Sequence, residues 1–221
     1  MMNEARTSDR RTALRRALIA AAERMIDERG HQALRARELA QEVGCALGAI
    51  YNVFPDLDAL ILAVKAQTLD DLEAEIARRF AATDAGVATA TAGDAAKRAL
   101  QTLAQIYLAF ASRHTRRWQT LFEHRSPNGG LPEAYAAKIE GILSHIERPL
   151  ETIAPSAAPI ERRMFARALL SAVHGVIARG LDENLGALPA EFLAWQVRAL
   201  VDAAASGVAD HPEIITMAGE A

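Results

Sequence analysis

The sequence predicts an all-α fold of about nine helices, and three observations indicate it. Alanine is frequent and strand-forming residues are sparse, which favours helix throughout. Apolar residues recur at three- and four-residue spacing along most of the chain. Glycine, proline or short polar stretches separate these periodic segments. The expected helices are 8–29, 36–43, 47–53, 56–80, 94–114, 115–124, 132–153, 159–181 and 189–205.

Several residues mark where these helices begin and end. Gly30 and Gly44 are suited to end helices, because glycine readily takes the positive φ of a helix C-terminus. Asp56 and Asp94 are expected N-caps. Pro149 falls inside the seventh pattern and should kink that helix. Residues 81–93 are expected to form a loop and 126–130 a turn.

Composition narrows the class of protein. The 221 residues carry a net charge of −3, and about half of them (51%) are apolar, enough for a substantial core. No stretch of about 18 uncharged apolar residues is present, and no apolar leader is evident near the start, so no membrane partner is expected. A single cysteine, Cys45, fits the reducing cytoplasm and is expected to be a small buried apolar residue.

Charge is unevenly distributed. Residues 1–54 hold nine arginines and seven acidic residues, whereas the remaining 167 residues hold 16 basic and 21 acidic ones. Five of those nine arginines lie within the first sixteen residues: Arg6, Arg10, Arg11, Arg15 and Arg16. A basic end on an acidic body suits a molecule that meets phosphate at one end, although charged runs are usually only solvated helix faces.

The segment 30–60 has the pattern of a helix-turn-helix. Ala40 is small where two helices must cross, and Gly44 can supply the turn. Ile50 and Phe54 would anchor the next helix to a core and leave its other face outward. A helix held in this way can enter the DNA major groove N-terminus first. An ordinary short helical pair is the alternative interpretation.

The same segment resembles the TetR/AcrR family of transcriptional regulators over about residues 14–64. The matching residues are Ala20–Ala22, Glu28–Gly30, Leu34, Glu38–Ala40, Gly44–Cys45, Gly48, Ile50–Tyr51, Phe54 and Leu60. The resemblance implies a three-helix helix-turn-helix DNA-binding domain (8–55) and a helical-bundle domain for ligand binding and dimerisation (56–207). Residues 208–221 are expected to be a flexible tail.

By the family's pattern, seven residues would face double-stranded DNA with a palindromic operator: Arg35, Arg37, Leu47, Gly48, Ala49, Tyr51 and Asn52. Arg37 and Asn52 would meet base edges, and Tyr51 a phosphate. The sequence departs from the family at Ala46, where a capping Ser or Thr is usual, and at Leu57, where a phosphate-binding Lys is common. The reading face is therefore unusually apolar.

The body carries two further candidate sites. A small effector, mainly apolar or weakly anionic, is expected among six residues: Tyr107, Phe110, His114, Trp118, Phe122 and Phe165. These residues are also the natural core of such a bundle. A homodimer interface is expected on the two C-terminal helices, at Arg167, Ser171, His174, Gly175, Ala178, Trp195 and Ala199.

A second, weaker resemblance concerns the C-terminal half. The residues Trp118, Phe122, His124–Arg125 and Val173–Gly175 are similar to a TetR-type C-terminal domain named for its Trp/Val-His-Gly element. The six histidines lack metal-ligand spacing, and no phosphate loop or nucleophile motif is present, so neither a metal, a cofactor nor enzyme activity is expected.

The function expected from the sequence is a DNA-binding transcriptional regulator, a repressor released from its operator by a small molecule. Two alternatives remain open at this stage. One is a helical protein-interaction module whose degenerate helix-turn-helix no longer binds DNA. The other is a helical-bundle enzyme.

Overall fold

The computed structural model describes residues 2–83, 91–126 and 132–216. The chain divides into two compact units. Unit 1 comprises residues 1–70 and 114–135, and unit 2 comprises residues 71–113 and 136–221. Residues 84–90 of the predicted loop and 127–130 of the predicted turn lie outside the described residues. The ends of the predicted loop, residues 81–83 and 92–93, are helical instead.

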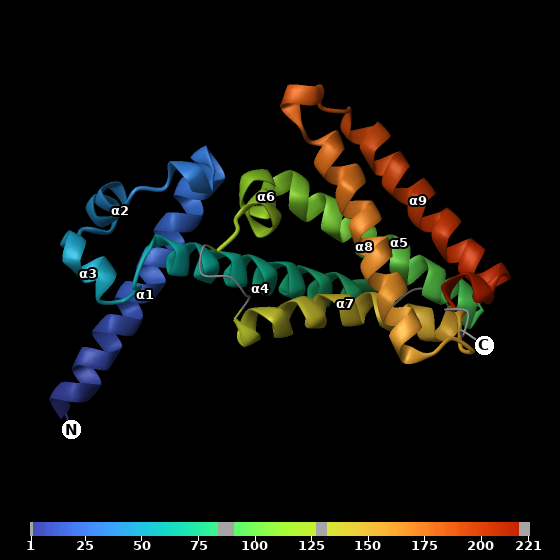
Figure 1. The fold of residues 1–221 in the computed structure, drawn as a ribbon, viewed down its shortest axis with the longest axis horizontal. Coiled ribbons are helices and arrows are strands. Elements are labelled where there is room, and N and C mark those ends of the chain that lie inside the picture. Colours follow the sequence, from blue (N-terminus) through green and yellow to red (C-terminus); the bar gives the residue numbers. More distant parts are fainter. Residues whose placement is uncertain (1, 84–90, 127–131, 217–221) are drawn as a thin grey trace. The chain divides into compact units, whose positions relative to one another are not determined.

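The all-α prediction is confirmed: the described residues form nine α-helices and three short 3₁₀ helices, with no strand among them (Figure 1). The α-helices are α1 (Met2–Arg29), α2 (Ala36–Val43), α3 (Leu47–Tyr51), α4 (Leu57–Thr83), α5 (Ala92–Arg113), α6 (Thr115–Glu123), α7 (Glu133–Ile153), α8 (Pro159–Gly180) and α9 (Ala190–Asp210). The 3₁₀ helices are η1 (His31–Ala33), η2 (Glu183–Leu185) and η3 (Pro212–Ile215).

Helix ends follow the expected chemistry with one exception. Gly30 and Gly44 both have positive φ, 78° and 72°. The Asp56 carboxylate accepts a hydrogen bond from the Ala59 amide at 2.7 Å, so it caps α4 as predicted. The cap of α5 is Thr91 rather than Asp94: the Thr91 hydroxyl accepts from the Asp94 amide and donates to the Asp94 carboxylate. Asp94 thus lies in the first turn of α5, where both its amide and its carboxylate are hydrogen-bonded to the capping Thr91.

Unit 1 is built on a core from α1, α2, α3 and the first half of α4. Leu18, Ile26, Leu39, Ile50 and Leu60 are completely buried in this core. Because the apolar face of α4 packs here, the predicted boundary at 55/56 does not coincide with the division between the units. α4 contributes residues 57–70 to unit 1 and 71–83 to unit 2, and α6 also belongs to unit 1.

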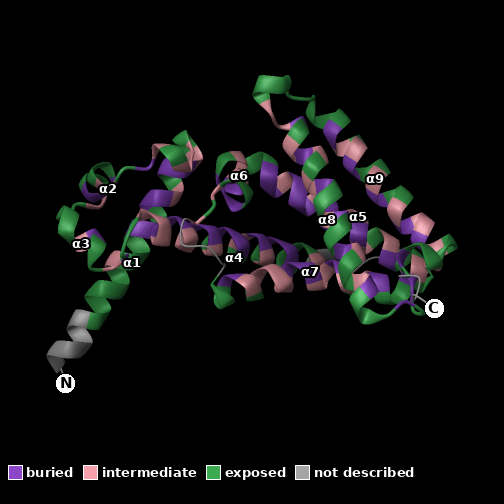
Figure 2. Cartoon of the chain, in the orientation of Figure 1, coloured by how far each residue is buried: buried purple, intermediate pink, exposed green. Residues whose placement is uncertain are grey.

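Unit 2 is organised around α5, α8 and α9. α5 packs along α9, and the antiparallel α8 and α9 pack on each other. Gly180 is needed at the end of α8, because a Cβ there would lie 2.5 Å from a methyl group of Leu193. Figure 2 shows buried and exposed residues alternating along α9, where the buried residues recur at helical spacing and so follow one side.

The segment expected to be a flexible tail is helical as far as Ile215. α9 continues to Asp210 and η3 follows at once, with Val208 and Ile215 buried. The η3 helix packs on α9 and α8. The apolar residues Ile214 and Ile215 explain the difference, since burying apolar surface stabilises a segment that the alanine-rich periodicity did not mark.

Candidate DNA-binding surface and ligand cavity

The turn between α2 and α3 is set by two small residues. Gly44 closes α2 in the left-handed region, and the Cys45 amide donates to the Ala40 carbonyl at 2.9 Å. Ala40 is buried at the crossing. Cys45 is half-buried and packs against the core of unit 1, as a small apolar residue would.

One face of α3 is anchored and the other faces solvent. Ile50 and Phe54 are buried, and no side chain caps the helix at Ala46. Leu47 and Tyr51 remain 38% and 48% exposed, although both are large and apolar. Gly48 and Asn52 are exposed as well, and Ala49 is half-buried. The five residues of this helix segment that the sequence singled out are therefore at least partly accessible, and their polar side-chain groups are the Tyr51 hydroxyl and the Asn52 amide.

The two arginines flanking this surface differ in their contacts. The Arg35 guanidinium donates to the carbonyls of Gln32 and Leu34 at 2.7 and 3.0 Å, so it braces the turn before α2. Arg37, two residues further on, is exposed on α2. Arg37 is therefore better placed than Arg35 to reach a ligand outside the chain.

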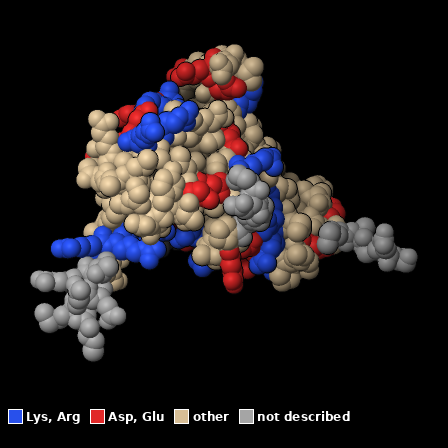
Figure 3. Space-filling model, turned by 60° about the vertical axis from the view of Figure 1, so that its left-hand side comes forward, with Lys and Arg blue, Asp and Glu red and all other residues tan. Residues whose placement is uncertain are grey.

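The first turns of α1 add positive charge. Arg10, Arg11, Arg15 and Arg16 are all exposed, and basic side chains gather at this part of the helix (Figure 3). The Arg15 guanidinium lies over the ring of Phe54, 5.1 Å from its centroid. This cation–π contact joins the basic stretch to the end of α3.

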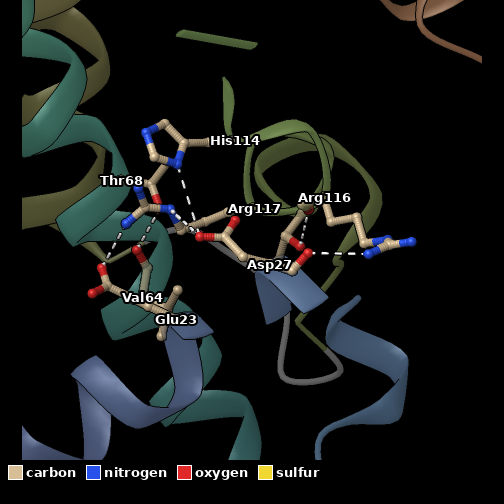
Figure 4. A network of polar contacts seen from close by, with 8 residues as sticks. Glu23, Asp27, Val64, Thr68, His114, Arg116 and Arg117 are labelled. Carbon is tan, nitrogen blue, oxygen red and sulfur yellow. Dashed lines mark hydrogen bonds and ion pairs between the residues drawn. The ribbon is translucent and has the colours of Figure 1, made fainter. Parts of the chain in front are cut away.

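A buried polar network fixes α6 to α1 (Figure 4). The Arg117 guanidinium, only 7% exposed, lies 3.0 Å from the Glu23 carboxylate and 3.7 Å from that of Asp27. Arg116 donates to the backbone carbonyls of Asp27 and Glu28 at the C-terminal end of α1. His114 lies 3.8 Å from Asp27. The sequence did not reveal this network, because nothing local links residues about ninety positions apart.

A second polar cluster joins α4 to the segment after α6. Asp58 accepts from Ser126 at 2.6 Å and lies 2.8 Å from His124 Nε2. The Lys65 ammonium donates to the His124 carbonyl at 3.1 Å. Burial lowers the pKa of Lys65, and Asp58 opposes this. Burial also lowers the pKa of His124. Ser126 contacts the aspartate rather than the imidazole, so these three groups lack the order of a nucleophilic triad.

Unit 2 contains an apolar cavity of about 40 Å³. Tyr107 is the one lining residue with a polar side-chain group. Its other lining residues are aliphatic: Leu72, Ile76, Leu100, Leu103, Ala104, Ile142, Ile146, Leu169, Leu170, Val173 and Val201. The phenolic oxygen of Tyr107 lies 3.1 Å from His174 Nδ1. Burial lowers the pKa of His174.

The six residues expected around an effector belong to two different units. Tyr107 lines the cavity of unit 2. Phe110, which is buried, and Phe165, which is half-buried, belong to the same unit but do not line the cavity. His114, Trp118 and Phe122 belong to unit 1. Trp118 is completely buried and stacks at a tilt on Phe122, which is 48% exposed. Sequence spacing could not separate these aromatics, because the division between the units falls within one turn, at Arg113 and His114.

Three of the seven residues expected at a dimer interface, Gly175, Trp195 and Ala199, line a groove on α8 and α9. A groove of about 730 Å³ is formed there by Gly175, Trp195 and Ala199, together with Ala172, Val176, Arg179, Leu188 and Gln196. Trp195 is 59% exposed. Arg167 pairs with Glu140, and Ser171 donates to the Arg167 carbonyl at 2.8 Å. Ala178 is half-buried. His174 differs from the rest of the set, because it contacts Tyr107.

Two kinds of feature are absent from the described residues. No helix among them is long and apolar enough to cross a membrane. They also contain no group of three or more His, Cys, Asp or Glu side chains placed to hold a metal ion.

The helix pair α2–α3, anchored by Ile50 and Phe54 with an exposed face on α3, defines a helix-turn-helix protein. Two family models match the chain. Residues 18–64 match the tetR family of bacterial regulatory proteins, and residues 100–204 match the C-terminal domain of tetracycline repressor-like proteins. Together the matches cover more than half of the chain, which therefore belongs to the TetR family.

Solved structures agree on the fold. A protein of unknown function from Rhodococcus sp. RHA1 has a TM-score of 0.68 at 23% identity, covering 89% of this chain and 95% of its own. A tetR-family transcriptional regulator from Streptomyces coelicolor gives 0.63 at 19% identity, with coverages of 90% and 84%. A TetR variant from Acinetobacter baumannii AYE in complex with minocycline gives 0.61 at 16%, with coverages of 90% and 97%. No curated protein matches the sequence significantly.

Proposed function

We propose that this TetR-family regulator is a repressor that binds a palindromic operator as a homodimer and leaves it when a small molecule binds. The observation that carries the proposal is the exposed face of α3, where Leu47 and Tyr51 face solvent while Ile50 and Phe54 are buried in the core. Exposing large apolar groups at a fixed position costs solvation free energy, so a binding role for them is favoured.

Each part of this face has a distinct contact to make with DNA. The Tyr51 hydroxyl can donate to a phosphate, and the Asn52 amide can pair with an adenine edge. Leu47 and Ala49 suit thymine methyl groups, and Gly48 allows the backbone to come close. Arg37 and the exposed arginines at the start of α1 supply the positive charge that Leu57 does not.

Dimerisation is supported by the α8–α9 face. Its groove, with Trp195 at 59% exposure, is lined mainly by apolar residues, together with Arg179 and Gln196. Two copies packed about a two-fold axis would bury it in a four-helix bundle. A Cβ added at Gly175 would meet no other atom within 4 Å, so the fold of one chain leaves space there for a partner helix.

Release by an effector is supported by the cavity in unit 2. The minocycline complex of the A. baumannii TetR variant shows that a protein of this fold can hold a small molecule. In this chain α4 supplies Leu72 and Ile76 to the cavity and Leu60 and Val64 to the core of unit 1. A ligand that favours a displaced α4 would lower operator affinity, whereas equal affinity for both positions would have no effect.

The test is binding to the DNA upstream of the protein's own coding sequence. We expect Tyr51→Ala to weaken binding to every sequence, and Asn52→Ala to relax specificity at one base pair by about 1–3 kcal/mol. Phe122→Ala is the matched control, since Phe122 is equally exposed in unit 1 but lies on α6. If both variants give the same DNA footprint as the unaltered protein, the proposal is contradicted and a protein-interaction role is favoured.

Assembly is tested separately. Gly175→Leu should separate the chains in light scattering without unfolding them, because a Cβ at this position meets no atom of its own chain. Ala77→Leu adds similar bulk to an exposed position of α4 and should leave the mass unchanged. A monomer mass for the unaltered protein would contradict the dimer.

A further inference from the structure

A groove of about 490 Å³ in unit 2 is lined by arginines from three helices. They are Arg79 of α4, Arg98 of α5 and Arg198 of α9. The other described residues that line the groove all belong to α5: Gln101, Thr102, Gln105 and Ile106. None of the described lining residues is acidic. Like charges gathered in a concave surface repel one another and attract anions, so this groove is suited to a negatively charged ligand.

The spacing of residues along α5 separates this groove from the aliphatic cavity. Arg98, Thr102 and Gln105 follow one another at intervals of four and three residues, so they lie on one face of the helix. The α5 residues that line the cavity are different ones: Leu100, Leu103, Ala104 and Tyr107. The groove and the cavity are therefore two distinct features of unit 2.

Two of the three guanidinium groups lack a direct partner. Neither Arg98 nor Arg198 forms a hydrogen bond or an ion pair with another described residue. The attraction of Arg98 contributes to the lowered pKa of Asp94, after the hydrogen bond from Thr91, but no ion pair joins the two side chains. The donors of Arg98 and Arg198 are thus available to a ligand.

The acidic groups beside the groove are already engaged by other side chains. Asp202 of α9 accepts a hydrogen bond from Gln101 Nε2 at 2.9 Å. The buried Glu75 carboxylate is paired with Arg78 and, at 2.8 Å, with Arg79. These two carboxylates therefore hold Gln101 and Arg79 in place and leave Arg98 and Arg198 unpaired.

Gln105 adds a donor without an acceptor. Its Nε2 is buried and has no hydrogen-bond partner within the described part of the chain. Burying a donor without an acceptor is unfavourable. The side chain as a whole is only half-buried and lines the groove, so a turn of the terminal amide would let it donate to an oxygen atom there. An anionic oxygen is the acceptor that would gain most from such a donor.

The groove has both the donors and the room for a multivalent anion. The guanidinium group presents its N–H donors in a rigid fork that matches carboxylate and phosphate oxygens. One water molecule needs on the order of 10–15 Å³, which is far less than the groove provides. We propose that the groove binds a small oxyanion with two or more negative charges, on carboxylate or phosphate groups, through Arg98, Arg198 and Gln105. It is a second ligand site of unit 2, in addition to the aliphatic cavity.

Calorimetric titration of the full chain at pH 7.5 and constant ionic strength tests the class of ligand. The probes are citrate, pyrophosphate, acetate and the neutral succinamide. We expect citrate, pyrophosphate or both to bind at least about tenfold more tightly than acetate, because further charges can contact further guanidinium groups. Succinamide should not bind. The tighter of the two multivalent probes shows whether carboxylate or phosphate is preferred. The proposal is wrong if neither of them binds, or if acetate or succinamide binds as tightly.

Matched substitutions locate the binding. Arg98→Gln and Arg198→Gln should each weaken the tighter probe about tenfold, since each removes hydrogen bonds from a charged donor. Gln105→Met keeps the shape of the side chain without its amide and should weaken binding about two- to tenfold. Arg148→Gln removes an exposed arginine of α7 that does not line the groove, and Arg37→Gln removes one at the DNA-binding surface. Both controls should stay within about twofold of the unaltered protein, because distant exposed charges are screened.

Two results would overturn the assignment. If a control variant loses as much affinity as Arg98→Gln and Arg198→Gln, the anions bind wherever positive charge is exposed. If Arg98→Gln and Arg198→Gln bind the probe like the unaltered protein but change the mass in light scattering, a second copy of the chain occupies the groove instead. The proposal expects the reverse, a loss of anion affinity at an unchanged mass.

Discussion

The two units differ in what they bury. Unit 1, the smaller in described residues, encloses Lys65, Thr68, Arg117 and Thr120, whereas unit 2 encloses two polar side chains of this kind, Glu75 and Glu161. Unit 2 instead contains an aliphatic cavity. Polar contacts are directional and permit few arrangements, while aliphatic contacts tolerate repacking.

This difference suits the roles proposed for the two units. A surface that reads DNA must hold α3 at a fixed angle, and the Arg117 network fixes α1 with α6. A site that senses a ligand must be able to change. The comparison therefore predicts that unit 1 is sensitive to lost polar contacts and unit 2 tolerant of altered volume.

The largest effect is expected at Arg117. Arg117→Ala removes the buried guanidinium from the pair with Glu23 and should cost about 3–5 kcal/mol of unfolding free energy. Arg24→Ala breaks an exposed pair with Glu42 at 2.7 Å and should cost less than about 1 kcal/mol. Denaturant unfolding measures both. Similar losses of unfolding free energy in the two variants would show that the buried network stabilises the protein no more than an exposed ion pair does.

The next largest effect concerns the exposed face of unit 2. Trp195→Ala should weaken dimerisation by at least about 2 kcal/mol, as expected for a central tryptophan in an interface. Phe122→Ala removes an exposed aromatic from unit 1 and should leave assembly unchanged. Sedimentation equilibrium distinguishes them, and a dimer that persists undiminished in Trp195→Ala would place the interface elsewhere.

A smaller effect sharpens the comparison of interiors. Ala21 is completely buried in the core of unit 1, and Ala104 lines the cavity of unit 2. Ala21→Val should cost about 1–3 kcal/mol through overpacking, whereas Ala104→Val should be stabilising by about 0.5–1 kcal/mol through cavity filling. Thermal unfolding reports both. Equal destabilisation by the two substitutions would mean that the cavity does not make unit 2 more tolerant of added volume than unit 1.

The smallest effect is on pH dependence, and each unit contributes one histidine. Burial lowers the pKa of both His124 and His174 from 6.5, so the unfolded chain takes up protons first as pH falls. The contribution of these two histidines to the free energy of unfolding should therefore be fully present above about pH 6.5 and decline below it. His124→Gln with His174→Gln should flatten this decline in melting temperatures between pH 7.5 and 5.5. An unchanged slope would assign the effect to other groups.

The helices and the helix-turn-helix could be predicted because their signals are local. Gly44, Ile50 and Phe54 stand at fixed offsets that a short segment reveals. The placement of α6 in unit 1 could not be predicted, since Arg117 and Glu23 are far apart in the chain. The sequence could not divide the effector set between the units for a similar reason: Tyr107 and Trp118 both look like core aromatics, and only tertiary packing assigns them to different units.

Thr91 and His174 show the same limit of sequence-based prediction. Thr91 rather than Asp94 caps α5, because either type can fill the role and the sequence does not fix where the helix begins. Helical spacing predicts that His174 lies on the dimer face, but spacing alone does not show that Tyr107 lies within hydrogen-bonding distance of it.

Hydrogen exchange of the backbone amides, measured with and without upstream DNA, tests the division of roles most directly. We expect upstream DNA to protect α3 and the residues just before α2, and to leave the parts of α5 and α8 that line the cavity unchanged. The account is contradicted if DNA leaves α3 unprotected.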